Sequence, residues 1–262
     1  MPSLQESIHA PHVLERNAVI AALDLDTSLQ KRANRMKDCG SHGRLYLEGY
    51  PPEVRLWVHR CGDRLCPLCS LYRGRQIADQ LRALMLGFKT MRHMVLTVQN
   101  APQGKLAESL SHLRASFARL RKMSGWKERV RGGAYIVEIT RSKKDGSWHP
   151  HLHIIFEGEY FRQQVLSALW ANASDGSTIV WVGMADKRHA NYLAKYAGKP
   201  ADLRGWKPAE IQEYARCTGR SRMVQTFGSM HGLKLEDRDS KPEPSNFRSS
   251  ITLKQLVQAA LT

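Results

Sequence analysis

Histidine and apolar residues alternate along residues 148–156, and this alternation constrains the fold more than any other feature. A β-strand sends successive side chains to opposite faces, so His149, His151 and His153 are expected on one face of a sheet. The apolar residues between them, which end at Phe156, are expected to pack on a core. Two imidazoles side by side on a rigid strand can hold a divalent metal ion. Taken alone, the stretch favours a simpler interpretation, a strand whose solvated face happens to carry histidines.

A hairpin is expected to bring a carboxylate to the same face. Residues 134–140 are predicted to form the preceding strand, and Asp145-Gly146 is a strong turn signal. If these two residues form a two-residue turn, Glu138 faces His153, and any loop of even length keeps Glu138 on the histidine face. A carboxylate beside two imidazoles suits Mg²⁺ or Mn²⁺. The alternative is a glutamate that pairs with a nearby cation.

The charge balance indicates an anionic partner. The chain of 262 residues carries 40 Lys and Arg against 24 Asp and Glu, a formal net charge of +16. Such an excess favours nucleic acid as the first candidate partner. No segment approaches the roughly 20 apolar residues of a transmembrane helix, and residues 1–16 lack the pattern of a signal peptide. We therefore expect a cytoplasmic protein without a membrane segment, whose cysteines stay reduced.

Three closely spaced cysteines predict a structural zinc site. Cys66 and Cys69 have the CxxC spacing of a zinc knuckle, and Cys61 adds a third thiolate. Tetrahedral zinc requires four ligands, and Cys39 is the preferred fourth. The alternatives for the fourth ligand are His42 and His59. A redox CxxC is the competing interpretation, but no thioredoxin-like strand precedes it.

The remaining periodicity predicts alternating strands and helices. Helices are expected over 13–36, 72–86, 102–122, 160–171, 187–197, 208–217 and 251–261. Strands are expected over 93–98, 134–140, 148–156, 178–182 and 223–227. The polar, proline-containing segment 236–250 is predicted to be a loose linker, and Cys217 to be an ordinary core residue. This order predicts an α+β fold in which helices pack on an antiparallel sheet.

Two tyrosines share one side of the predicted helix over 187–197. Tyr192, Tyr196 and Lys199 lie at i, i+4 and i+7. Tyrosines at this spacing are usually core or rim residues. A phenol, with a pKa near ~10, becomes a useful nucleophile when a metal or a cation favours its anion. A tyrosinate that attacks phosphorus forms a phosphotyrosine, which keeps the energy of the cut bond for resealing.

His151-Leu152-His153 followed by Tyr192 and Tyr196 resembles the HUH endonucleases, which are named for their His–hydrophobic–His pair. More closely, the chain resembles the Rep proteins that start rolling-circle replication of small bacterial plasmids. The matching stretches, in family order, are residues 36–40, 63–69, 96–100, 138–140, 144–146, 151–153 and 194–196. Several independent motifs in the right order make a specific match.

This resemblance implies a five-stranded HUH sheet with helices packed on it. It implies that His151 and His153 bind the metal ion, with Glu138 as the third ligand and Tyr196 as the nucleophile. Many plasmid Rep proteins carry a glutamate four positions before that tyrosine, where this chain has Tyr192. The arrangement resembles instead the two-tyrosine initiators of single-stranded DNA phages and some rolling-circle transposases.

The implied activity is metal-dependent, site- and strand-specific DNA nicking with strand transfer through a 5′-phosphotyrosine. The substrate is expected to be single-stranded or hairpin origin DNA, and the free 3′-OH would prime a host polymerase. The chain has no G-x-x-x-x-G-K-[ST] loop, so unwinding would require a host helicase. The alternatives are a transposase or relaxase of the same superfamily, and a non-catalytic zinc-containing DNA-binding regulator.

The predicted organisation places the catalytic residues in the middle of the chain. It consists of a helical leader (1–38), a zinc-binding module (39–75), a catalytic domain (76–200), its C-terminal extension (201–235), and a flexible linker with a terminal helix (236–262).

Overall fold

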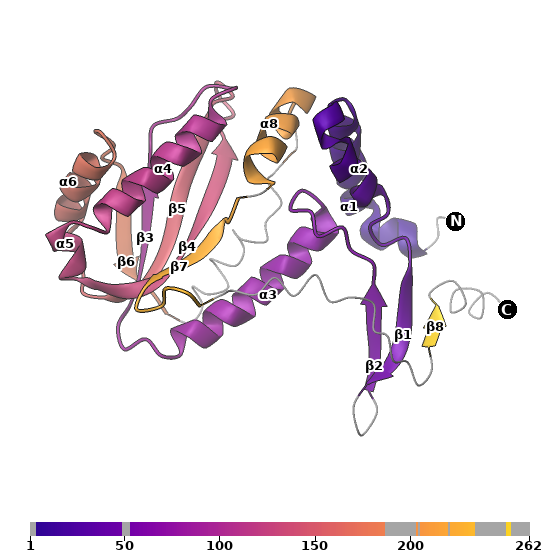
Figure 1. Ribbon diagram of the computed structural model, residues 1–262, viewed down its shortest axis with the longest axis horizontal. Coiled ribbons are helices and arrows are strands. Elements are labelled where there is room, and N and C mark those ends of the chain that lie inside the picture. The colour runs from indigo at the N-terminus through magenta and orange to yellow at the C-terminus, as the bar shows by residue number, and fades with distance from the viewer. Residues whose placement is uncertain are drawn as a thin grey trace.

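A five-stranded antiparallel sheet with strand order β6-β3-β5-β4-β7 forms the centre of the computed structural model (Figure 1). The structure describes residues 4–48, 53–186, 203, 205–219, 221–233 and 250–252. The five strands are β3 (Met91–Thr97), β4 (Val130–Arg141), β5 (Trp148–Gly158), β6 (Val180–Met184) and β7 (Val224–Gly228). The strand that carries the histidines, β5, is central and pairs with β3 on one side and β4 on the other. The predicted α+β fold with a five-stranded antiparallel sheet is therefore confirmed.

One face of this sheet packs on two helices, α4 (Leu106–Leu120) and α6 (Gln163–Ala173). Leu152, Ile154 and Phe156 of β5 point to this side and are fully buried, as their alternation with the histidines predicts. The buried side chains of α4 are Leu106, Leu110, Leu113, Ser116, Phe117 and Leu120, which follow the helical repeat. Burial of each large apolar side chain here stabilises the fold by roughly 1.5–3 kcal/mol relative to leaving it exposed to water.

The opposite face carries the histidines and is partly covered by α3 (Pro67–Met85). Proline fits the first turn of this helix because its fixed φ is helical and its missing N–H would have no partner there. Three buried residues of α3, at positions 77, 81 and 85, pack on Ile136 of β4 and Ile155 of β5. The apolar end of β5 on this face is thus covered by α3, and the histidines follow towards the other end of the strand.

The loop between β4 and β5 is longer than the predicted two-residue turn. Glu138 lies opposite His151, and not opposite His153 as a two-residue turn requires. The Ser142 N–H donates to the Ser147 carbonyl at 2.8 Å and closes the loop, and Gly146 adopts a left-handed φ of 72°. The register therefore shifts by two residues. Because the shift is even, Glu138 stays on the histidine face.

The N-terminal segment forms two helices where one is predicted. They are α1 (Leu4–Asp24) and α2 (Gln30–Lys37), with a 3₁₀ turn (Thr27–Leu29) between them. Asp26 separates the two helices, because its side chain accepts the Ser28 N–H at 2.9 Å and so caps the start of the 3₁₀ turn. The helix α1 packs on α8 (Pro208–Thr218), where Gln212 donates to the Ala22 carbonyl at 2.8 Å.

A second, three-stranded sheet has the order β2-β1-β8. Its strands are β1 (Gly43–Glu48), β2 (Glu53–Val58) and β8 (Ser250–Thr252), and none of them is predicted from the sequence. The predicted linker over 236–250 and helix over 251–261 are wrong at residues 250–252, where backbone pairing with β1 produces a strand. The rest of these two segments, and the predicted helix over 187–197, lie outside the described residues.

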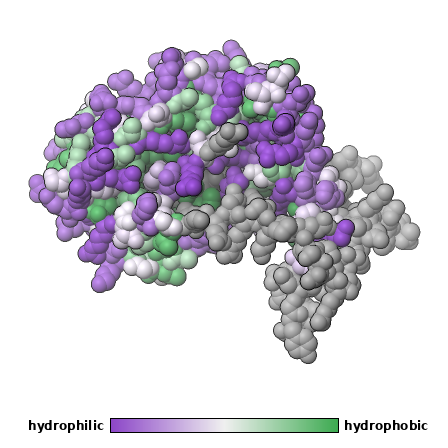
Figure 2. All heavy atoms as spheres, viewed as in Figure 1, coloured by the Kyte–Doolittle hydropathy of each residue, from purple (hydrophilic) through white to green (hydrophobic). Residues whose placement is uncertain are grey.

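A further short helix, α5 (Ser124–Lys127), precedes β4. Among the residues that the structure describes, no helix is long and apolar enough to cross a membrane. Hydrophilic side chains dominate the face of the molecule seen in Figure 2, with apolar ones scattered between them.

Candidate metal and active site

Glu138, His151 and His153 meet on the two central strands of the main sheet. One carboxylate oxygen of Glu138 lies 2.7 Å from His151 Nε2 and 2.9 Å from His153 Nε2. The two imidazoles are buried, and the donor atoms of all three residues lie within 4.8 Å of one another. His149, on the same face, instead contacts Asn100 through its Nδ1. The geometry thus selects two of the three histidines as one potential metal-binding group.

The charge states of this group suit a divalent cation. Burial alone would raise the pKa of Glu138, but hydrogen bonds from His151 and His153 outweigh it and hold the pKa at about 2. Burial lowers the pKa of His153, so its imidazole is neutral at neutral pH. An ionised carboxylate and a neutral imidazole are both in the form that a divalent metal ion needs in its ligands, and the carboxylate suits Mg²⁺ and Mn²⁺. The residues present therefore fit a metal ion.

The outer nitrogens of both imidazoles also have partners. His151 Nδ1 lies 3.1 Å from the His149 carbonyl, and His153 Nδ1 lies 3.4 Å from His93 Nε2. A carbonyl can only accept, so with a metal ion bound it would keep the proton of His151 on Nδ1 while Nε2, which faces Glu138, binds the ion. His93 Nε2 can accept from His153 Nδ1 in the same metal-bound state, and its buried ring lies nearly parallel to that of His153, with the ring centroids 5.6 Å apart.

Sequence reasoning missed His93. It lies on β3, and a cross-strand neighbour is visible only once β3 and β5 are paired in register. The sequence gives only a weak signal for this contact. His93, Val95 and Thr97 occupy every second position, as expected for residues on one face of a strand.

Replacement of His93 by alanine should weaken Mn²⁺ binding about 10- to 100-fold, the usual cost of removing such an outer partner of a metal ligand. Calorimetric titration of zinc-loaded protein with Mn²⁺ measures this affinity. His112→Ala is the control, because His112 contacts the Ser174 carbonyl and lies outside the group. Unchanged Mn²⁺ affinity in His93→Ala would show that His93 only packs against His153.

The start of β5 is held in place by α8. Glu213 of α8 accepts hydrogen bonds from Trp148 Nε1 at 2.9 Å, from the Gly104 N–H at 2.8 Å and from the Leu106 N–H at 2.9 Å. Arg141, at the end of β4, forms an ion pair of 2.7 Å with the buried Glu210 of α8. These contacts fix both strands of the hairpin beside the histidines, which favours precise placement of the metal-binding side chains.

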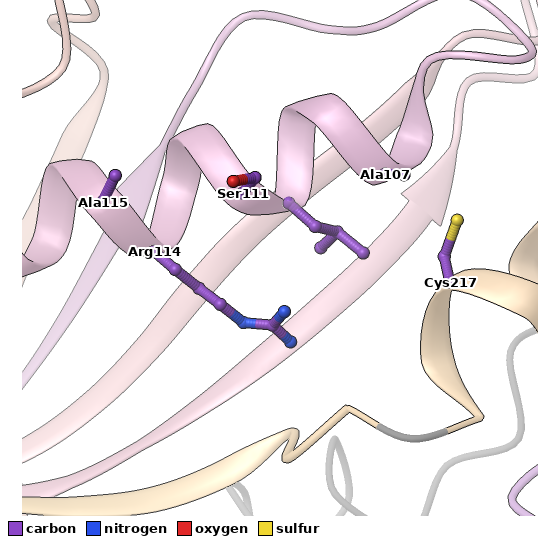
Figure 3. A pocket seen from close by; sticks show the side chains of 6 residues that line it. Ala107, Ser111, Arg114, Ala115 and Cys217 are labelled. Atoms are coloured by element: carbon purple, nitrogen blue, oxygen red, sulfur yellow. The ribbon is translucent and has the colours of Figure 1, made fainter.

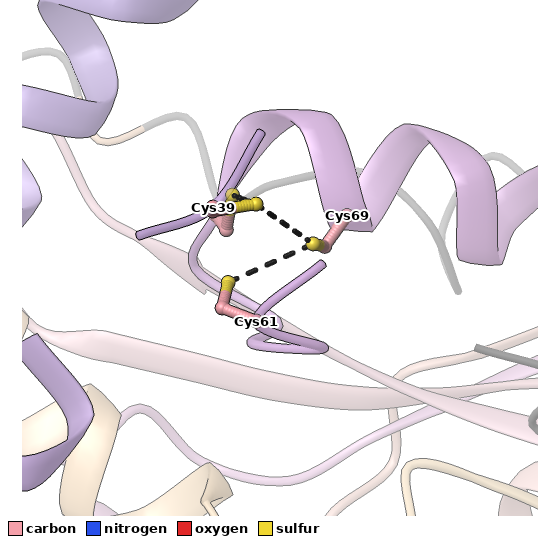
Figure 4. Close-up of side chains that lie close together, drawn as sticks. Cys39, Cys61 and Cys69 are labelled. Carbon is pink, nitrogen blue, oxygen red and sulfur yellow. Dashed lines mark hydrogen bonds between the residues drawn. The ribbon is translucent and has the colours of Figure 1, made fainter. Parts of the chain in front are cut away.

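Four cysteines form a second potential metal-binding group (Figure 4). The Sγ of Cys39 lies 3.5 Å from that of Cys69 and 3.6 Å from that of Cys66, and Cys61 Sγ lies 3.6 Å from Cys69 Sγ. These distances are too long for disulfides, and all four cysteines are free. Tetrahedral zinc with Zn–S bonds of ~2.3 Å would separate the sulfurs by about 3.8 Å. The spacing therefore fits a tetrahedral ion.

The electrostatics of the cysteine group agree with this fit. Hydrogen bonds from the thiols of Cys61, Cys66 and Cys69 lower the pKa of Cys39 far below its usual range, so one thiolate is favoured before any metal binds. The alternatives His42 and His59 lie outside the group among the described residues and stack on each other at 4.6 Å.

Replacement of Cys66 by serine should remove the zinc, whose binding contributes to the free energy of folding. The unfolding temperature should fall by roughly 10 °C, since each kcal/mol of unfolding free energy that is lost lowers it by about 2–4 °C in a chain of this size. Elemental analysis, expected to give one zinc per chain for the wild type, and thermal unfolding measure the two effects. Cys217→Ser is the control because Cys217 is outside the group. A Cys66→Ser protein that keeps one zinc would contradict the assignment.

A cavity of about 460 Å³ lies between α4 and α8, and neither metal-binding group lines it. Its lining residues are Ala107, Leu110, Ser111, Arg114, Ala115 and Cys217 (Figure 3). Cys217 packs against the main core but is only partly buried, so it is a residue of the core's edge and belongs to neither metal-binding group. The predicted nucleophile Tyr196, together with Tyr192 and Lys199, lies outside the described residues.

Comparison with known proteins identifies replication proteins as relatives. A family model described as "Replication protein" matches residues 54–255, most of the chain. The chain is 26% identical over 156 residues to Protein rep of Bacillus amyloliquefaciens, an alignment that covers 55% of this chain and 46% of the relative. It is also 26% identical over 180 residues to Protein rep of Streptococcus pneumoniae, which covers 62% of this chain and 54% of the relative. The chain thus spans about half the length of these two relatives.

A shorter relative matches over more of its length. Protein rep of Staphylococcus aureus is 27% identical over 193 residues, which covers 66% of this chain and 84% of the relative. No solved structure matches the chain.

Proposed function

Because this chain belongs to the family of replication proteins, we propose that it initiates rolling-circle replication of a plasmid by nicking one strand of the origin DNA. The observation that carries this proposal is the convergence of Glu138, His151 and His153 on the central strands of the sheet. A role in DNA binding alone does not explain a carboxylate and two imidazoles around one buried point.

Glu138, His151 and His153 would hold Mg²⁺ or Mn²⁺. Such an ion, when bound, supplies Lewis-acid polarisation and orientation of the scissile phosphate. The residues of the chain do the rest. The His149 carbonyl and His93 orient the two imidazoles, and the hairpin contacts of Glu213 hold their strand.

Tyr196 is the proposed nucleophile, on the basis of the resemblance to plasmid Rep proteins. Its phenolate oxygen attacks the scissile phosphorus, and the bond from phosphorus to the 3′-oxygen breaks. The DNA 5′ end is then linked to Tyr196, and the free 3′-OH can prime a host polymerase in the cytoplasm, with a host helicase to unwind the duplex. Tyr192 would attack the regenerated junction after one round, while the 3′-OH resolves the first link.

The four cysteines would hold structural zinc and stabilise the module over residues 39–75, which precedes the proposed catalytic domain. The two alternatives from the sequence differ in what they explain. A non-catalytic regulator accounts for the net charge and the cysteines but not for the histidine group. A transposase or relaxase accounts for Tyr192, but the family match to replication proteins favours an initiator.

One experiment tests the proposed function directly. Wild-type protein is incubated with Mn²⁺ and labelled single-stranded oligonucleotides that tile the candidate origin. A covalent protein–DNA adduct on a denaturing gel, formed with one oligonucleotide and strand only, is expected. Specific binding of the origin without any adduct or cleaved product would favour the regulator.

A further inference from the structure

The hairpin formed by β1 and β2, here called the arm, stands apart from the main sheet (Figure 1). No described helix packs along either of its strands. Its base is fixed beside the cysteine group, because the Gly40 N–H donates to the His59 carbonyl and the His59 N–H donates to the His42 carbonyl, both at 2.9 Å. Cys39 and Cys61 flank these hydrogen bonds in the sequence. The arm is therefore short, projecting and held at its base by a potential metal site.

The pairing register of β1 and β2 places the side chains of the arm on two faces that differ in chemistry. Arg44 lies opposite Trp57, and His42 and His59 extend this pairing towards the base. Since alternate residues share a face, His42, Arg44 and Tyr46 of one segment lie on the same face as Trp57 and His59 of the other. The opposite face is apolar, with Val54 at 68% and Leu56 at 54% exposure.

Three rings on the first face touch one another. His42 and His59 are stacked at 4.6 Å with an angle of 14°, and the ring of Trp57 lies 5.9 Å from His42 and 6.4 Å from His59. His42 is exposed, and Trp57 and His59 are partly so. A tryptophan whose purpose was to bury apolar surface would be expected on the face of Val54 and Leu56, yet Trp57 lies on the face of the arginine and the histidines.

Aromatic rings next to cationic side chains are the chemistry that binds single-stranded nucleic acid. Every base offers a flat face that can stack on such rings, and nearby arginines attract the phosphates. We propose that the face of the arm formed by His42, Arg44, Tyr46, Trp57 and His59 binds single-stranded DNA by base stacking. The proposal rests on the proposed function and deepens it. The helix α3 separates the arm from the main sheet in Figure 1, so the nucleotides bound by the arm flank those that are cut.

The test measures binding of fluorescently labelled oligo(dT), and of a duplex of the same length, by anisotropy without added Mg²⁺ or Mn²⁺. Trp57→Ala should weaken oligo(dT) binding about tenfold, the typical effect of removing one stacking ring, and should leave duplex binding nearly unchanged. Trp57→Phe keeps a ring and should retain most of the affinity. Leu56→Ala is the matched control, because Leu56 is the adjacent residue and lies on the opposite face. This variant should bind oligo(dT) like the wild type.

Three results would overturn the proposal. The first is wild-type affinity for oligo(dT) in Trp57→Ala. The second is an equal loss for oligo(dT) and duplex in Trp57→Ala, and the third is an equal loss in Leu56→Ala and Trp57→Ala. Either of these would indicate an effect on the fold or on phosphate binding. Zinc content and thermal unfolding of each variant check that the arm is intact. The adduct assay on wild-type protein keeps the two proposals separate, since a missing adduct contradicts nicking while the oligo(dT) comparison still decides the role of the arm.

Discussion

Tyr196→Phe is expected to abolish the covalent protein–DNA adduct, whereas Tyr192→Phe is expected to form it and then fail to release a closed single-stranded circle. The reason is the division of roles that the resemblance implies, with the first transfer on Tyr196 and the second on Tyr192. Phenylalanine keeps the ring and its packing, so a lost reaction reports the missing hydroxyl. Denaturing gels detect the adduct, and circular product is detected by its resistance to exonuclease.

Peptide mapping of the adduct on wild-type protein supports these roles if the phosphate is found on Tyr196. If Tyr192→Phe alone stops the first cut, the roles are reversed. If either single variant starts and finishes normally, the tyrosines are interchangeable or the replaced one is only structural. The other single variant separates these two cases, because it also completes the reaction in the first and forms no adduct in the second.

Alanine at both His151 and His153 is expected to slow cleavage by about 10³-fold or more, because the stabilisation that a bound cation gives to a transferring phosphate amounts to several kcal/mol. DNA binding should remain largely intact, since contacts with phosphates rest on dispersed Lys and Arg side chains. Glu138→Ala should have a smaller effect on metal dependence, as it leaves both imidazoles. Initial rates of nicking over a range of Mn²⁺ concentrations, with anisotropy for DNA binding, measure the two properties.

His149→Ala is the matched control for this pair. It lies on the same strand and face, but its side chain contacts Asn100 and not Glu138, and alanine keeps the backbone carbonyl that His151 contacts. It should retain most of the nicking activity. Full activity in the double variant would contradict the metal site. A similar loss in His149→Ala would indicate damage to the strand as a whole.

The parts of the fold with regular local patterns are predictable from the sequence. The leucines and phenylalanine of α4 repeat at helical spacing and are buried as expected, and the alternation along β5 gives both its buried and its histidine faces. The group of Glu138, His151 and His153 comes together for the same reason, because an even error in loop length leaves the face of Glu138 unchanged.

Other features depend on contacts that local patterns do not contain. The loop before β5 is stabilised by the Asp145 side chain, which accepts the Ser147 N–H at 3.0 Å, and so it is longer than an Asp-Gly pair suggests. His93 reaches His153 only through pairing of β3 with β5. The residues of β8 form a strand because β1 provides an edge for them. The division of the chain into domains and the roles of the two tyrosines stay predictions.

The pairing of β8 with β1 has a consequence for the order of folding. Leu45 and Ile251 are partners in this sheet although about 200 positions separate them, and closing so long a loop is costly in entropy. The arm and its cysteines are close in sequence and can form early, but the third strand of their sheet can join only after residue 252 has been synthesised. A nascent chain therefore presents β1 as an open edge throughout most of its translation.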